Sequence, residues 1–230
     1  DGKRMVFGEE YARIFYFYDR YAWGRIHAYE WNQPQKQWVN MDTENVLVGD
    51  NDFRRLGYRG ALSKDGTRLF TSTLEASYFG TGKERPNSSP VTHRHSNSGG
   101  GKVFEWVPDG SGEPGQGRWK QLGNTVHGSY SNDRLGEFGT MSADGNTMFL
   151  TSRYGRGNDH GHEGYARIYR WNETHWTQLG GDLPAGEIDR LQPGADHLHG
   201  LITRERAERV DEILVMDQRP QALGALLRKR

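Results

Sequence analysis

Histidine is the residue type whose spacing in this chain best suits chemistry. His-x-His triplets occur at positions 93–95, 160–162 and 197–199. The first two lie ahead of equivalent aromatic stretches, so we expect them on equivalent loops of a repeat. Neutral imidazoles from neighbouring loops would suit Zn²⁺, Cu²⁺ or Ni²⁺. The predicted metal ligands are His93, His95, His160 and His162.

Two acidic residues, Asp159 and Glu163, flank the second triplet. They would add oxygen ligands or a general base to such a metal site. The stretch 158–163 also has the alternating oxygen ligands of a Ca²⁺ loop, although His stands at two of its six positions. The alternative interpretation is that these histidines are polar residues of solvated Gly- and Ser-rich loops. A divalent metal, Zn²⁺ or Ca²⁺, is therefore the cofactor hypothesis.

Acidic residues also recur at fixed places of the sequence. They are Asp52, Asp133 and Asp189 ahead of a glycine-rich stretch, and Asp65 and Asp144 before a glycine. Paired carboxylates support glycoside cleavage when they are held at the right separation. Turn chemistry explains the Asp-Gly pairs, and Asp133 is interpreted as a cap of its own loop. The sequence has no nucleophile elbow, Walker loop or dinucleotide fingerprint, so an enzyme is not indicated.

The elements that must position these residues follow two alternating half-motifs. The first half-motif is Ser-x-Asp-Gly followed by an apolar pair, at 63–70 and 142–149. A third copy, at 1–6, lacks the first residues of the motif. Asp-Gly between apolar stretches predicts a tight hairpin, because the turn needs a positive φ that glycine adopts without steric cost.

The second half-motif is an aromatic strand that ends in Trp, a loop, and a second Trp that opens another strand. It occurs at 28–31 with 38–41, at 103–106 with 119–122, and at 168–171 with 176–179. These copies contain six of the seven Trp residues, which we therefore predict to pack in the core and along strand edges.

A glycine-centred strand at 56–63, repeated at 135–142, joins the two half-motifs. Each period then has four short antiparallel strands, which is typical of a β-propeller blade. We expect an all-β array of about three blades over residues 1–186: a partial blade 1–63, a blade 64–142 and a partial blade 143–186. Closed propellers have ~4–8 blades. We therefore expect a fragment, or open edges that another chain or the C-terminal segment covers.

The succession 119–123, 133–136 and 142–145 resembles the FG-GAP-type repeat of integrin-α-like β-propellers. The resemblance implies a β-propeller fold. The sequence departs from this pattern after each Asp-Gly strand, where 71–73 and 151–153 replace a Gly-Ala-Pro-like turn. It also has no complete Asp-x-Asp-x-Asp-Gly loop, so the calcium binding of such propellers is not carried over.

The repeat ends near residue 186, and residues 187–230 are predicted to form a helical C-terminal segment. Ile202, Val210 and Ile213 fit one helical stripe, and Pro220 separates it from a second short helix. This segment would dock across a propeller edge, act as a separate interaction element, or be a sequence artefact where the repeat was lost.

Composition excludes several classes of protein. The 30 Lys and Arg balance the 30 Asp and Glu, so nothing favours nucleic acid as a partner. Without Cys the chain has no disulfides and no Cys-ligated zinc, and no apolar stretch is long enough for a membrane span. Sequons at 87–89 and 172–174 favour a secreted protein slightly, but the compartment stays open.

The leading hypothesis for function is a non-enzymatic binding module that presents propeller rim loops to a protein or glycan partner. One alternative is a metal-dependent or carbohydrate-active enzyme that uses the rim histidines and carboxylates. The other is a structural subunit whose open blades are completed by another chain or by further propeller blades.

Overall fold

The computed structural model describes residues 3–12, 23–42, 44, 46–50, 53–82, 91–153, 155 and 164–184, with only the backbone for 78–82 and 91–95. All regular structure in these residues is β, with no helix, and every sheet is antiparallel. The expectation of an all-β fold is therefore confirmed for the described residues. The helical segment predicted for 187–230 lies outside them.

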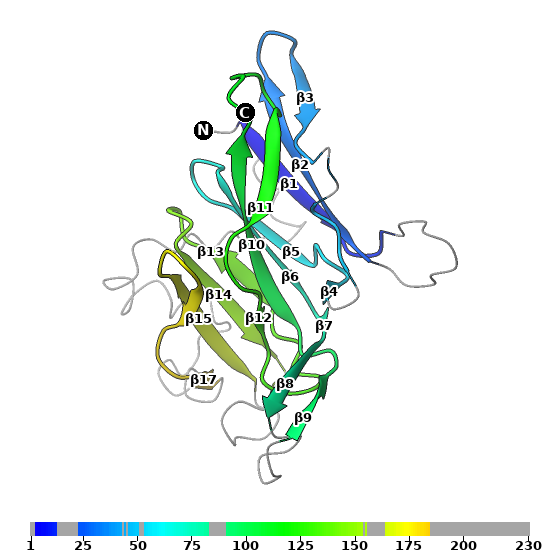
Figure 1. Ribbon diagram of the computed structural model, residues 1–230, viewed down its shortest axis with the longest axis vertical. Helices are drawn as coiled ribbons and strands as arrows, with labels where there is room; N and C mark the ends of the chain where they lie inside the picture. The colour runs from blue at the N-terminus through cyan, green and yellow to red at the C-terminus, as the bar shows by residue number, and fades with distance from the viewer. Residues whose placement is uncertain are drawn as a thin grey trace, which may run out of the picture.

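Three sheets make up most of the structure (Figure 1). The first has the order β1 (Arg4–Glu9), β2 (Arg25–Asn32), β3 (Gln37–Asn40). The second has the order β5 (Arg59–Leu62), β6 (Arg68–Thr73), β10 (Gly100–Pro108), β11 (Gly117–Gln121), with β12 (Val126–His127) also on β10. The third has the order β13 (Phe138–Met141), β14 (Thr147–Ser152), β15 (Tyr165–Trp171), β16 (Trp176–Gln178), with β17 (Leu183–Pro184) also on β15.

Two short strand pairs complete the regular structure of the described residues. They are β4 (Phe53–Arg54) with β7 (Glu75–Ala76), and β8 (Tyr78–Gly82) with β9 (Val91–His95). The β8–β9 hairpin lies at the bottom of the view in Figure 1. No helix in the described part of the chain has the length and apolar character needed to cross a bilayer.

The three sheets repeat the same backbone hydrogen bonds. The N–H groups of Trp31, Trp106 and Trp171 donate to the carbonyls of Lys3, Thr67 and Asn146 at 2.7, 2.8 and 2.9 Å. Those of Met41, Leu122 and Leu179 donate to Ala28, Val103 and Ile168 at 2.9, 2.8 and 2.8 Å. The sequence repeats are therefore structural equivalents, residue by residue.

The Asp-Gly pairs form the predicted hairpin turns between β5 and β6 and between β13 and β14. Gly66 and Gly145 have φ of 71° and 70°, in the left-handed region that favours glycine. The Ser63 hydroxyl donates to Asp65 at 2.6 Å and accepts from the Arg68 N–H at 2.9 Å. Burial would raise the pKa of Asp65, but hydrogen bonds from Ser63 and Thr67 outweigh it and lower this pKa.

The paired Trp residues face each other across the outer hairpin of each sheet. The pairs are Trp31 with Trp38, Trp106 with Trp119, and Trp171 with Trp176, with ring centroids 5.3, 5.3 and 5.4 Å apart. Trp106, Trp119 and Trp176 are buried, as core packing predicts, whereas Trp38 is 41% exposed. The pairs nevertheless differ in what covers them.

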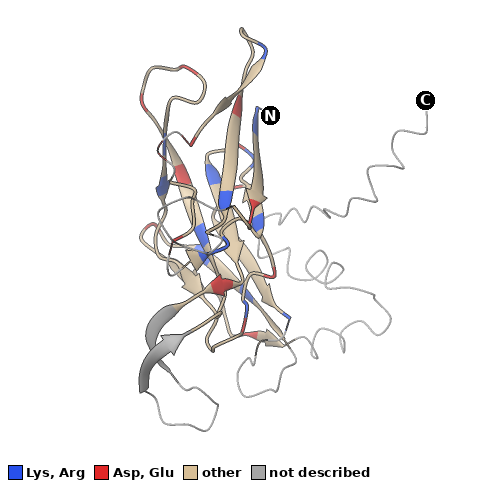
Figure 2. Ribbon diagram, turned by 90° about the vertical axis from the view of Figure 1, so that its right-hand side faces the viewer, with Lys and Arg blue, Asp and Glu red and all other residues tan. Residues whose placement is uncertain are grey.

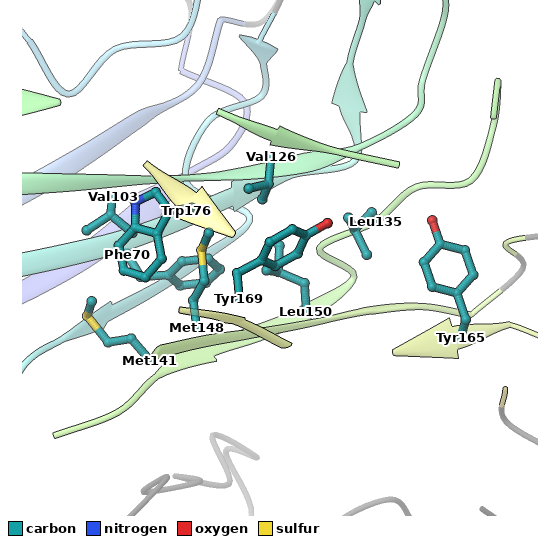
Figure 3. Close-up of a cluster of buried hydrophobic side chains, with 10 residues drawn as sticks. All are labelled: Phe70, Val103, Val126, Leu135, Met141, Met148, Leu150, Tyr165, Tyr169 and Trp176. Atoms are coloured by element: carbon teal, nitrogen blue, oxygen red, sulfur yellow. The ribbon is translucent and has the colours of Figure 1, made fainter. Parts of the chain in front are cut away.

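The sheets stack face to face, with the second between the other two (Figure 1). One apolar cluster joins the first and second sheets and includes Ile26, Ala28, Leu69 and Trp119. The other joins the second and third sheets, where Phe70 and Val103 meet Met148, Leu150 and Trp176 (Figure 3). In the second and third sheets, we call the side that faces the preceding sheet the upstream face, and the other side the downstream face. The equivalent sides of the first sheet have the same names.

Candidate functional site

The predicted metal ligands are only partly within the described residues. His93 and His95 lie on β9, where their backbones pair with Gly80 and Tyr78, so this part of the expected loop is a strand. His160, His162, Asp159 and Glu163 lie outside the described residues. Within the described ranges, no group of three or more His, Asp or Glu residues could hold a metal ion. The histidine metal site therefore stays a prediction.

The recurring aspartates that the structure describes have structural partners. Asp133 is buried, and its Oδ2 accepts from the Tyr130 N–H at 3.0 Å and the Tyr165 hydroxyl at 2.8 Å. It caps its own loop, as the sequence predicts, and also anchors the start of β15. Asp65 and Asp144 accept hydrogen bonds within their turns. Asp52 and Asp189 lie outside the described residues.

A small polar hollow lies between β4, β7 and the turn after β9. It has a volume of about 170 Å³ and is lined by Arg54, Glu75, Ser77, Ser96 and Asn97. Sites for small organic molecules are usually mostly apolar and occupy ~300–1,000 Å³. The hollow is therefore too small and too polar to be the main candidate site.

A buried ion pair fastens the third sheet to the edge of the second. Arg167 on β15 donates to both carboxylate oxygens of Asp182, at 2.6 and 2.9 Å, and to the His127 carbonyl of β12 at 3.2 Å. Burial would raise the pKa of Asp182, but the hydrogen bonds and charge of Arg167 outweigh it and lower this pKa. The guanidinium also lies over the Tyr165 ring, so the pair has a structural role.

The upstream faces of the second and third sheets are covered. In the second sheet this face carries Leu69, Phe104, Trp106 and Trp119, all buried. In the third sheet it carries Met148, Leu150, Tyr169 and Trp176, also buried. Trp119 and Trp176 are only 2% and 3% exposed, and the Trp176 indole donates to the Leu122 carbonyl of the second sheet at 2.9 Å.

The upstream face of the first sheet has the same kinds of residue, but they are exposed. Met5, Phe7 and Trp38 are 36%, 51% and 41% exposed. By repeat position Met5 corresponds to Leu69 and Met148, and Trp38 corresponds to Trp119 and Trp176. Residues that fill an interface in two sheets therefore contact solvent in the first.

An aromatic ladder runs along this exposed face. The Phe7 ring stacks on His27 with centroids 4.8 Å apart and lies 6.1 Å from the Tyr29 ring. Trp31 and Trp38 continue the ladder at the other end of β2. Exposed apolar side chains gathered on one face of a folded chain commonly mark an interaction site.

An arginine fixes each of the first two sheets to the sheet that follows it. Arg4 donates to the Gly66 carbonyl at 2.9 Å, and the equivalent Arg68 donates to the Gly145 carbonyl at 3.2 Å. Each arginine also pairs with a glutamate of its own sheet, Glu30 or Glu105. The third sheet has Thr147 and Arg170 at these positions. We call this hydrogen bond to the following sheet the forward contact. It occurs in the first two sheets, and the third sheet lacks the arginine that makes it.

Charged residues of both signs are interspersed along the strands and loops (Figure 2). No family model matches the chain, and a search of curated proteins finds no similar sequence. The candidate site therefore stands on the geometry alone: an exposed, aromatic upstream face on the first sheet, defined by Met5, Phe7 and Trp38.

Sequence reasoning did not single out Met5, Phe7 or Trp38 as functional residues. The signal was available in part, because the repeat alignment pairs them with Leu69, Thr71 and Trp119. That alignment shows which residues share a face. It does not show that one of the three faces is uncovered, which only the stacking of the sheets reveals.

Proposed function

We propose that the chain is a non-enzymatic interaction module. Its sheets act as consecutive blades of a β-propeller type, and the upstream face of the first blade is completed by another polypeptide. The observation that carries this proposal is the exposure of Met5, Phe7 and Trp38 at positions whose equivalents are buried between sheets. The partner is a protein that presents an apolar sheet face.

Energetics support a protein partner for this face. Burying a large apolar side chain stabilises a structure by ~1.5–3 kcal/mol. Three such side chains are exposed together here, beside the stacked rings of His27 and Tyr29. These side chains are 36–51% exposed, so a second sheet that covered them would gain the part of this free energy that corresponds to their exposed surface.

The two interfaces between the sheets of this chain indicate which kind of surface that partner presents. In both, the upstream face of one sheet meets branched or aromatic side chains of the sheet before it, such as Val6 and Ile26 or Phe70 and Val103. The same apolar chemistry would fit against Phe7 and Trp38. A metal ion would leave most of this apolar face in contact with water.

The proposal is tested by adding one repeat to the chain. Residues 56–143 placed directly before Asp1 would recreate the Ala143-Asp-Gly junction and supply both a preceding sheet and a glycine-centred strand. We expect hydrogen exchange of β1 and β3 to slow by at least tenfold, because their exposed face and edge become covered. A matched control carries Phe70→Asp and Val103→Asp in the added copy only.

Two results would contradict the proposal. One is unchanged exchange of β1 and β3 in the extended chain while the added repeat is itself protected. The other is turnover of glycosides or esters above background by the purified chain, with or without added Zn²⁺ or Ca²⁺, which would favour the enzyme alternative.

A further inference from the structure

The turn between β15 and β16 contains an Asn-x-Thr triplet, Asn172-Glu173-Thr174. Such a triplet, with any residue except proline in the middle, is the acceptor signal for N-linked glycosylation. All three residues and the adjoining His175 are exposed, at the tip of the outer hairpin of the third sheet. The signal therefore lies in a surface turn, where a bulky and hydrated modification can be accommodated.

We propose that Asn172 accepts an N-linked glycan in a chain that passes through a secretory compartment. In this reaction the Asn172 side-chain nitrogen bonds to the anomeric carbon of a sugar, and the bond from that carbon to a lipid-linked diphosphate breaks. The nitrogen gives one of its two protons to the transferase, and the lipid diphosphate leaves as an anion. The co-reactant is a lipid-linked oligosaccharyl diphosphate, and no oxidant or reductant takes part.

The turn places the hydroxyl that the triplet requires beside the acceptor amide. The Asn172 Oδ1 accepts from the Thr174 hydroxyl at 2.9 Å and from the Thr174 N–H at 3.1 Å. It also accepts from the His175 N–H at 2.9 Å. These bonds make an Asx-type turn, in which a side-chain carbonyl holds the backbone that follows it. Because Oδ1 and not the nitrogen closes the turn, a sugar on Nδ2 leaves these bonds in place.

The acceptor nitrogen itself has only exposed neighbours. Nδ2 donates to the Thr177 hydroxyl at 3.2 Å and lies 3.1 Å from Nε2 of His175. Asn172, His175 and Thr177 are all exposed, so water can replace each of these contacts. An asparagine amide has two N–H groups, and a glycosylated one keeps one of them. The hairpin can therefore carry the sugar without losing a buried hydrogen bond.

The first sheet offers a matched comparison at the same repeat position. Asn32, like Asn172, directly follows the Trp that ends the aromatic stretch. Asn32 is only 7% exposed, and its Oδ1 accepts from the Gln35 N–H at 3.0 Å. Pro34 stands where the triplet needs Ser or Thr. The signal is thus absent where the asparagine is buried and present where it is exposed.

This inference goes beyond the proposed function and is independent of it. In the second sheet the equivalent loop packs on the first sheet, where the Gly115 N–H donates to Glu30 at 2.8 Å. Within the described part of the chain, Asn172 and Thr174 form hydrogen bonds only inside their own hairpin. The third sheet also lies at the other end of the stack from the upstream face of the first sheet. A glycan at Asn172 therefore leaves that face accessible.

The test uses the full chain behind a cleavable signal peptide in cultured eukaryotic cells. Asn87→Gln in every variant leaves Asn172 in the one remaining sequon. We expect an added mass that an endoglycosidase removes from the native protein, because the turn is exposed. Asn172→Gln and Thr174→Ala should abolish the added mass, whereas Thr174→Ser should keep it. The urea denaturation midpoint should be the same before and after removal of the glycan.

A matched control moves the acceptor signal to the buried asparagine. Pro34→Thr combined with Thr174→Ala makes Asn32 the acceptor. A glycan there would open a buried turn, so we expect about fivefold less secreted protein. The same variant made without glycosylation should keep its urea denaturation midpoint, which separates the effect of the glycan from that of the substitutions.

Four outcomes would overturn the proposal. They are no added mass in the chain with the intact triplet, an added mass that persists in both Asn172→Gln and Thr174→Ala, a glycan that is released only after denaturation, and undiminished secretion of the chain glycosylated at Asn32. None of them affects the proposed function, which depends on the first sheet.

Discussion

Trp119 and Trp38 occupy equivalent positions in the second and first sheets, and each pairs with a Trp at the same ring distance. Trp119 is 2% exposed, whereas Trp38 is 41% exposed. The local structure is the same in both sheets, so the difference comes from the neighbour that covers one face and not the other. Identical residue types therefore stabilise the fold in one sheet and remain available for binding in the other.

The largest expected effect distinguishes these two tryptophans. Trp119→Ala should lower the free energy of unfolding by about 3–5 kcal/mol, because it opens a cavity in the cluster between the first and second sheets. Trp38→Ala should lower it by about 1 kcal/mol, since it removes mainly the contact with Trp31. Urea denaturation followed by far-UV circular dichroism measures both. Equal losses of free energy in the two variants would contradict the difference in burial between Trp119 and Trp38.

The next effect concerns the buried ion pair of the third sheet, whose Arg167 also donates to the His127 carbonyl of the second sheet. Asp182→Ala should cost about 3 kcal/mol, because it leaves the Arg167 guanidinium buried without its carboxylate. The control Glu113→Ala changes an exposed carboxylate and should shift the denaturation midpoint little. If both substitutions had the same small effect, the pair would not hold the third sheet in place.

A smaller effect is expected from the forward arginines. Arg4→Met and Arg68→Met should each lower the free energy of unfolding by about 1 kcal/mol, because each removes a hydrogen bond to a glycine carbonyl in the following sheet. The two losses should be similar although the upstream faces of their sheets differ in exposure. A loss at Arg68 alone would show that the first sheet is weakly joined to the second.

The smallest effect is on the pH dependence of stability. The pKa of Asp182 is lowered in the folded chain, so its contribution is present above the unfolded pKa near 3.8 and is lost as pH falls through the folded value. Urea denaturation between pH 7 and pH 2.5 should therefore show stability falling in acid, and Asp182→Asn should fall less steeply. An equally steep fall in Asp182→Asn would assign the effect to other carboxylates.

Much of the fold could be predicted because its signals are local. The Asp-Gly turns, the glycine-centred strands and the paired Trp residues each depend on a few consecutive residues, and those within the described residues appear where the sequence indicates. The Asp-Gly pair at 1–2 lies outside the described residues. The turn at Gly66 and the pair of Trp106 with Trp119 are examples. Residue type and spacing alone determine such elements.

The rest depends on contacts between distant segments. The exposure of Phe7 reflects which sheets stack together, and the pairing of Arg167 with Asp182 joins positions that no repeat relates. The β8–β9 hairpin was also not predicted, because its strand β9 has the sequence Val-Thr-His-Arg-His, which reads as a polar loop. A repeat pattern identifies the faces of the strands, but stacking determines which face stays in solvent.

The forward contacts of Arg4 and Arg68 have a consequence for synthesis on the ribosome. Each arginine is translated before the glycine carbonyl that it binds, 62 and 77 residues later in the chain. The first sheet therefore emerges with its downstream face uncovered until the second sheet leaves the exit tunnel. Each of the first two sheets therefore gains its forward hydrogen bond only after the following sheet has been synthesised.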